Sequence, residues 1–150
     1  MVLQNFLENE IYVRLMRVHV RETLSLLFQE GVYFSILVNI SEVKFDPELP
    51  KHITRTFKPI TMFVLAGYTF ESARVMEGEL VFEAGFGQEN IGSFVTVPLS
   101  AILQIVIEDT PILINLSIPK EPKVADKGGV KKSMEALLSN PENQKLFKKP

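Results

Sequence analysis

The chain has 150 residues, enough for one domain with a substantial core, and it contains no cysteine. The lack of cysteine excludes disulfides, thiolate nucleophiles and cysteine-built zinc sites, and it suits a reducing cytoplasm. No apolar run reaches the ~20 residues of a membrane span, and the N-terminus lacks the basic region of a signal peptide. We therefore expect a cytoplasmic protein without membrane contact.

The formal net charge of −2 conceals an asymmetry along the chain. Residues 1–119 hold 8 basic and 14 acidic residues, whereas residues 120–150 hold 8 basic and 4 acidic residues. An acidic body with a basic tail suggests two different partners. The acidic body counts against a generic nucleic-acid binder, because phosphate contacts need basic side chains.

A long amphipathic helix is predicted for residues 11–29, from Ile11 to Gln29. Asn9 precedes it as the N-cap candidate, and Gly31 follows it in the usual C-terminal position. Its first apolar stripe consists of Val13, Met16, Val20, Leu24 and Leu27. Its second apolar stripe consists of Ile11, Leu15 and Val18. The second stripe either packs in the core of the same chain or forms the contact of a homodimer.

Short strands follow the helix and are interrupted by turns. The expected strands before the middle of the chain are residues 32–40, 43–45, 53–57 and 60–65, with Pro47 and Pro50 in a loop between the second and the third. Residues 66–70 leave the last of these strands, and residues 71–78 are interpreted as a polar connection.

The clearest strand signal is a hairpin. Residues 79–86 alternate, residues 87–92 supply Gly and Asn for a turn, and residues 93–97 form the returning strand, which Pro98 ends. Residues 99–107 are a compact apolar segment for which helix and strand remain open, with a helical turn favoured. A last strand is predicted for residues 112–118, with Ile112, Ile114, Leu116 and Ile118 on its apolar face.

One helix followed by about six short strands predicts an α+β fold, either a small barrel or packed sheets with a helical cap. From Pro119 onward the composition changes to Lys, Pro and Gly, which is typical of a flexible tail. We therefore divide the chain into a folded domain at residues 1–119 and a basic tail at residues 120–150.

Residues with the spacing of a catalytic or metal site are lacking. The chain holds two histidines, His19 and His52, and they do not form a metal-ligand motif. Neither Ser93 nor Ser100 lies in a nucleophile-elbow sequence. The sequence therefore predicts a protein that is not an enzyme and that uses no metal or cofactor.

Residues 79–105 resemble the SspB family, the bacterial adaptors that deliver tagged proteins to the ClpXP protease. The matching positions are Glu79, Phe82, Ala84, Phe86, Gly87, Val97, Pro98, Leu99, Ala101, Leu103 and Ile105. The chain departs from the family pattern at Gly85, where Arg is usual, at Gln88, where a second Gly is usual, and at residues 107–111. The resemblance implies a small SH3- or Sm-like barrel and a homodimer formed through the N-terminal helix.

The resemblance also implies a function. An SspB-like protein binds an extended degradation tag of the ssrA type in a groove and uses a flexible tail to contact the ClpX unfoldase. Carried over, the peptide-binding residues are Ala66, Phe82, Ala84 and Phe86. Phe82 and Phe86 can equally be core residues, because they alternate on one strand face, whereas Ala66 and Ala84 leave room for a peptide. In the tail, Leu146, Phe147 and Lys148 are the expected tether.

Two other functions remain open at this point. The first is an Sm-like RNA-binding module, which would use Arg14, Arg17, Arg21 and the tail lysines, with Tyr68 or Phe70 stacking on bases. The second is a structural protein that dimerises through the helix and has no peptide groove.

Overall fold

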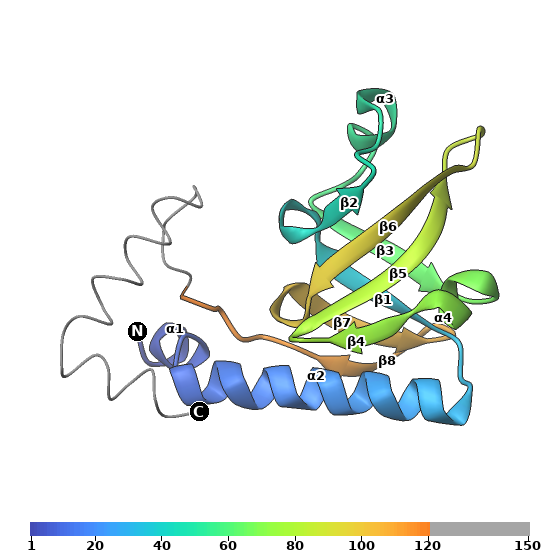
Figure 1. Cartoon of the computed structure of the whole chain (residues 1–150). Coiled ribbons are helices and arrows are strands. Elements are labelled where there is room, and N and C mark those ends of the chain that lie inside the picture. The colour runs from blue at the N-terminus through green and yellow to red at the C-terminus, as the bar shows by residue number, and fades with distance from the viewer. Residues whose placement is uncertain (121–150) are drawn as a thin grey trace, which may run out of the picture. The chain divides into compact units, whose positions relative to one another are not determined.

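The computed structural model describes residues Met1–Lys120, and residues Met1–Pro119 form one compact unit. Its helices are α1 (Val2–Leu7), α2 (Glu10–Glu30), α3 (Lys51–Thr54) and α4 (Tyr68–Ser72), with 3-10 turns η1 (Ile40–Glu42) and η2 (Leu99–Ala101). Its strands are β1 (Phe34–Asn39), β2 (Lys44–Asp46), β3 (Ile60–Leu65), β4 (Arg74–Met76), β5 (Glu79–Phe86), β6 (Ile91–Pro98), β7 (Ile102–Ile107) and β8 (Thr110–Ile114). Figure 1 shows α2 running along one side of the strands, close to β4.

The long predicted helix is confirmed as α2. Its N-cap is Asn9, whose side-chain oxygen accepts hydrogen bonds from the main-chain N–H groups of Ile11 at 2.9 Å and Tyr12 at 3.0 Å. Gly31 ends the helix in the left-handed conformation, with φ of 67°. The first apolar stripe is buried as expected. Helix α1, which precedes α2, was not predicted.

The α+β class is confirmed, but the strands do not close into a barrel. They form two antiparallel sheets of four strands, in the orders β3-β1-β7-β8 and β2-β6-β5-β4. The chain passes from one sheet to the other four times, at η1 between β1 and β2, through α3 between β2 and β3, through α4 between β3 and β4, and at η2 between β6 and β7. Within residues Met1–Lys120 no ladder joins the edge strands of the two sheets, so of the two predicted arrangements the packed sheets are found, and the small barrel that the SspB resemblance implies is not closed.

The central hairpin is confirmed. Strand β5 pairs with β6 along its whole length, from Glu79 opposite Pro98 to Phe86 opposite Ile91, without a register shift. The inward residues of β5 change from buried to partly exposed toward the turn: Leu80 and Phe82 are buried, whereas Ala84 and Phe86 are partly exposed. The hairpin therefore extends from the core out to the surface, as Figure 1 also shows.

Three predictions of local structure need correction. The strand expected at residues 53–57 is replaced by the helical turn α3, in which the N–H of Ile53 donates to the carbonyl of Pro50 at 3.0 Å and Ile53 is buried. The polar connection at residues 71–78 contains the end of α4 and strand β4. The segment at residues 99–107, for which helix and strand were both open, contains one of each: its first three residues form the 3-10 turn η2, and the rest form strand β7.

The last predicted strand is shorter than expected, and its apolar face points outward. Strand β8 ends at Ile114, and the apolar residues Ile114 and Leu116 point outward, whereas Leu113, Asn115 and Ser117 are buried. A register shift between Ile105 and Val106 lies in the β7–β8 ladder. A one-residue shift in a ladder exchanges the two faces of a strand.

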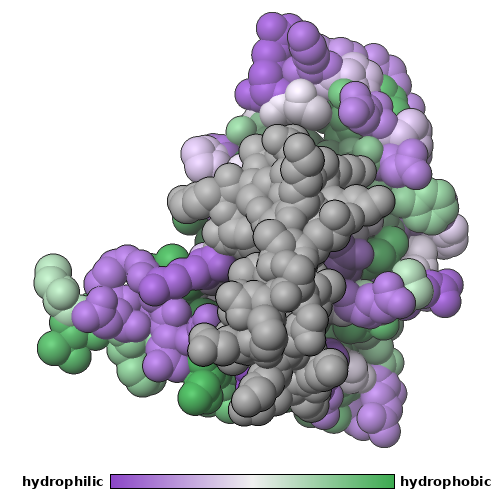
Figure 2. Space-filling view, turned by 60° about the vertical axis from the view of Figure 1, so that its left-hand side comes forward, coloured by the Kyte–Doolittle hydropathy of each residue, from purple (hydrophilic) through white to green (hydrophobic). Residues whose placement is uncertain are grey.

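The surface of the described residues is uneven in polarity. In Figure 2 the end of the molecule that carries α3 is mainly hydrophilic. Among the exposed hydrophobic residues of α1 and α2 are Leu3, Phe6, Ile11 and Leu15. In the same range, Met1 to Lys120, the helices are all too short or too polar to cross a membrane.

Candidate functional site

The four predicted peptide-binding residues occupy four different environments. Ala66 directly follows β3 and is partly exposed. Ala84 lies in a surface groove, and Phe86 lines a second depression near the β5–β6 turn. Phe82 is only 1% exposed and belongs to the hydrophobic core. The structure therefore brings Ala84 and the chain after Ala66 to one place, but not all four side chains.

Phe82 packs inside the protein. Its ring lies 5.7 Å from that of Phe63 on β3, centroid to centroid. Phe86 is close to three other rings, at 5.6 Å from Phe45, 6.0 Å from Phe57 and 6.2 Å from Phe63. Of the two interpretations of Phe82, the buried position supports the core residue, because a peptide at the surface does not reach this ring.

The groove that contains Ala84 has a volume of about 330 Å³. Its lining consists of Tyr68, Thr69, Glu83, Ala84, Gly85, Asn90 and Gly92. Tyr68 and Thr69 come from α4, which begins two residues after Ala66, and the other residues come from the β5–β6 hairpin. Gly85 and Gly92 are directly opposite each other in the ladder, so two adjacent positions of the sheet lack side chains. The groove is therefore a surface depression on the β5–β6 hairpin that is bordered by α4 on one side.

Gly85 is required by its neighbour Asn90. A Cβ atom at Gly85 would lie 1.8 Å from the side-chain oxygen of Asn90, so any larger residue has to displace that side chain. Asn90 has a φ of 53° in the turn, a conformation that Asn tolerates better than most residues. The side chain of Asn90 thus occupies the space outside Gly85, where the SspB pattern usually has Arg.

The edge of β5 is the second feature of the groove. Strand β4 pairs only with Glu79 to Val81, and beyond this point the N–H of Glu83 donates to the hydroxyl oxygen of Ser72 at 2.9 Å. Main-chain groups of successive residues alternate between the two edges of a strand, so the N–H and C=O of Gly85 face the same edge as those of Glu83. In the described chain no strand pairs with this edge at Gly85, and Gly85 is exposed.

Glu83 carries the only charge among the residues that line the groove. The hydroxyl of Tyr68 donates a hydrogen bond to Oε1 of Glu83. The pKa of Tyr68 is raised above its usual value, mainly by this hydrogen bond and secondly by the negative charge of Glu83. The tyrosine hydroxyl therefore stays protonated and holds the carboxylate at the groove.

Two further depressions lie near α3. The first, of about 490 Å³, has Ile53, Phe57 and Phe86 among its lining residues, and at its rim Nε2 of His52 lies 3.7 Å from Oε2 of Glu89.

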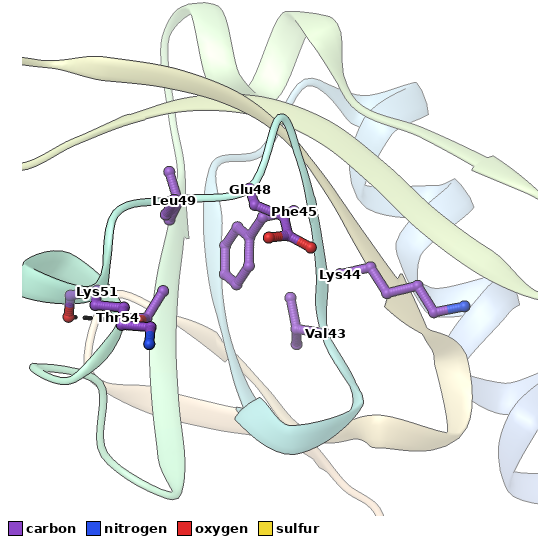
Figure 3. Close-up of a pocket in the computed structure, with 7 residues that line it drawn as sticks. All are labelled: Val43, Lys44, Phe45, Glu48, Leu49, Lys51 and Thr54. Carbon is purple, nitrogen blue, oxygen red and sulfur yellow. Dashed lines mark hydrogen bonds between the residues drawn. The ribbon is translucent and has the colours of Figure 1, made fainter. Parts of the chain in front are cut away.

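The second, of about 520 Å³, is bounded by β2 and α3 and contains none of the predicted site residues. Figure 3 shows Val43 and Phe45 pointing into the same space and the side chain of Lys44 pointing away. No cluster of three or more potential metal ligands occurs within residues Met1–Lys120.

The residues of the RNA-binding alternative are not arranged as one surface for stacking. Tyr68 is exposed, but Phe70 packs among Phe28 at 5.2 Å and Tyr33 at 5.0 Å. Phe70 is therefore unavailable for stacking on a base in this conformation. Arg14, Arg17 and Arg21 are exposed on α2.

Sequence reasoning missed most of the groove lining. The two glycines Gly85 and Gly92 were a usable signal, because glycine inside a strand often marks a close approach of another backbone. The contact between Tyr68 and Glu83 had no local signal. The predicted tether residues Leu146, Phe147 and Lys148 lie outside the described residues.

In comparisons with known proteins, the chain matches no protein-family model, no curated protein and no solved structure.

Proposed function

We propose that this protein binds an extended peptide along the edge of β5 at Gly85. The observation that carries the proposal is the unpaired edge of this strand next to the groove formed by Tyr68, Glu83 and Ala84. An extended chain at such an edge gains main-chain hydrogen bonds, and pockets for alternate side chains add specificity. Gly85 has no side chain of its own at this edge, and the side chain of Asn90 covers the position that a Cβ of Gly85 would take.

We further propose the role that the SspB resemblance implies. The bound peptide is then a degradation tag of the ssrA type, and the protein delivers the tagged substrate to the ClpXP protease. The tail at residues 120–150 acts as the tether, with Leu146, Phe147 and Lys148 as the contact with ClpX. A tether raises the effective concentration of the substrate at the unfoldase, so weak contacts suffice. In this proposal the two sheets correspond to an opened SH3- or Sm-like barrel.

The homodimer through α2 also remains a proposal. The second apolar stripe of the helix faces outward in the single chain, with Ile11 70% and Leu15 61% exposed. Burying these side chains against a second copy would remove apolar surface from water. The sedimentation coefficient of the full chain measures whether this dimer forms.

The proposed strand addition is tested by blocking the β5 edge. Asn90→Gly first removes the side chain that fills the space outside Gly85, and Gly tolerates the positive φ at this position. Gly85→Pro in this background removes the N–H at the edge and puts a ring carbon in its place. Affinity for fluorescein-labelled peptides, including an ssrA-type tag, should fall at least about tenfold in fluorescence anisotropy, because a hydrogen bond is lost and the edge is obstructed.

Asn90→Gly alone is the matched control and should retain binding. The melting temperatures of both variants have to be measured beside the titrations, because Pro at an edge is tolerated only if no ladder bond is lost. Full peptide affinity in the folded double variant would rule out docking along this edge.

Delivery is tested with the tail. Removing every residue after Pro119 should leave peptide affinity unchanged, because the groove lies within residues Met1–Pro119. The same truncation should abolish the stimulation of ClpXP degradation of a tagged reporter at low substrate concentration, where effective concentration matters most. Stimulation by the truncated protein would place the tether elsewhere, and no stimulation by the full chain would reject the adaptor role.

A further inference from the structure

We infer that the peptide bound in this groove carries a lysine or arginine whose side chain pairs with Glu83. This inference rests on the proposed peptide-binding function and names the class of peptide. It follows from three properties of Glu83: it is held in place, no cation among the described residues pairs with it, and it lies next to the strand edge along which the peptide would run.

Glu83 is held from two sides by α4. Its main-chain N–H donates to the hydroxyl oxygen of Ser72 at 2.9 Å, and its Oε1 accepts from the hydroxyl of Tyr68. Tyr68 lies fifteen residues earlier in the chain, so the contact fixes the carboxylate relative to α4 as well as to β5. A ligand that pairs with this carboxylate has less side-chain entropy to overcome than one that pairs with a mobile surface acid.

Glu83 lacks a counter-charge in the described part of the chain. The ion pairs found among residues Met1–Lys120 join Arg21 to Glu22 and His52 to Glu89, and neither includes Glu83. The other residues that line the groove are uncharged. Tyr68 satisfies one carboxylate oxygen with a neutral donor, and its hydrogen bond to Glu83 and the charge of Glu83 raise the pKa of Tyr68.

The position of Glu83 relative to the edge indicates which side chains of a bound peptide can reach its carboxylate. Gly85 presents its main-chain groups at the edge, and Glu83 is the next residue of β5 with the same orientation. A paired peptide strand places alternate residues on the groove side. The long stems of lysine and arginine can cross the groove beside Tyr68, whose side chain is 68% exposed, and bring a cation to the carboxylate.

The charge of the whole folded domain acts in the same direction. With 8 basic and 14 acidic residues at positions 1–119, the domain attracts a basic peptide at long range and repels an acidic one. An acidic side chain beside Glu83 would in addition place two like charges close together. A basic peptide is therefore favoured by the local contact and by the overall field.

The experiment uses the full chain and the tightest-binding peptide of the labelled set. Lys, Gln and Glu are placed in turn at each position of this peptide, and the dissociation constants are measured by anisotropy at low and at high salt. We expect one position at which Lys binds about fivefold tighter than Gln and Glu binds more weakly than Gln. The preference should shrink at high salt, because the groove is open to solvent.

Two variants of the protein test whether Glu83 causes the preference for lysine in the peptide. Glu83→Gln retains an oxygen that accepts from Tyr68 but removes the charge, and it should abolish the difference between Lys and Gln at that position. Glu22→Gln removes the same charge from the exposed surface of α2, where it pairs with its neighbour Arg21, and it should leave the difference unchanged.

The outcomes separate this inference from the function on which it rests. If peptides bind but Lys and Gln are equal at every position, or if Glu binds tighter than Lys, the inference is wrong and peptide binding stands. If the lysine preference survives Glu83→Gln, another acid carries it and the assignment to Glu83 is wrong. If no peptide binds, the proposed function itself fails.

Discussion

Phe82→Ala is expected to lower the free energy of unfolding by about 3–5 kcal/mol, the usual cost of truncating a buried phenylalanine. Phe82 is among the largest fully buried side chains, and its ring contacts that of Phe63 across the space between the sheets. The substitution leaves a cavity between two sheets whose strands cannot easily collapse into it. Because domains of this size have a stability of about 5–15 kcal/mol, such a loss brings the protein close to unfolding. Guanidinium denaturation of both proteins measures it.

Phe86→Ala provides the matched control, since it is the same chemical change on the same face of β5. Phe86 is partly exposed and lines a depression, so its removal should cost clearly less than that of Phe82. Equal losses for the two variants, or a Phe82→Ala protein as stable as the parent, would contradict the buried position of Phe82. Loss of peptide binding by a fully stable Phe82→Ala protein would instead indicate that Phe82 contacts the peptide in the groove.

The second large effect is expected at Asn115, which is 4% exposed. Its Nδ2 donates to the carbonyl of Ile102 at 3.0 Å, and its Oδ1 accepts from the N–H of Ser117 at 3.0 Å and from the Ser117 hydroxyl at 2.6 Å. Asn115→Ala removes the partners of these buried groups at once. We expect a loss of about 2–3 kcal/mol, because buried polar groups without partners cost ~1–3 kcal/mol.

Leu116→Ala is the informative comparison for Asn115→Ala. Leu116 is 57% exposed, so its truncation should change the stability by no more than about 0.5 kcal/mol. A segment with the apolar face of residues 112–118 turned inward would show the reverse order of losses, with Leu116 buried and Asn115 exposed. Denaturation of the two variants at low protein concentration thus decides which face of the segment is buried. A larger loss for Leu116→Ala would contradict the inward position of Asn115.

Helix α2 and the β5–β6 hairpin could be predicted from sequence because their signals are local. Asn9 caps the N-terminus of α2, and Gly31 ends its C-terminus in the left-handed conformation. The first apolar stripe of the helix repeats at helical spacing. The hairpin combines an alternating strand with a turn in which Gly87 and Asn90 adopt positive φ. In each case the residues that specify the element lie within a few positions of the residues that they affect.

The inward face of the last segment could not be predicted in this way. Alternation shows that residues 112–118 have two different faces, but both faces are compatible with a strand. The buried face was decided by the register shift against β7 and by the carbonyl of Ile102, which the amide of Asn115 satisfies. The carbonyl that the Asn115 amide contacts thus lies thirteen residues away, outside the local pattern of the segment.

The sequence by itself determined the α+β class, the long helix and the hairpin, and it placed the small residue Ala84 on the strand that borders the groove. Only the tertiary structure decided that the two sheets stay open, that Phe82 is a core residue, and that Tyr68 and Glu83 meet at the groove. The physical reason is the range of the interactions. Capping, turn conformation and periodicity act between neighbours in the chain, whereas sheet closure, burial and the Tyr68–Glu83 contact depend on how distant segments pack.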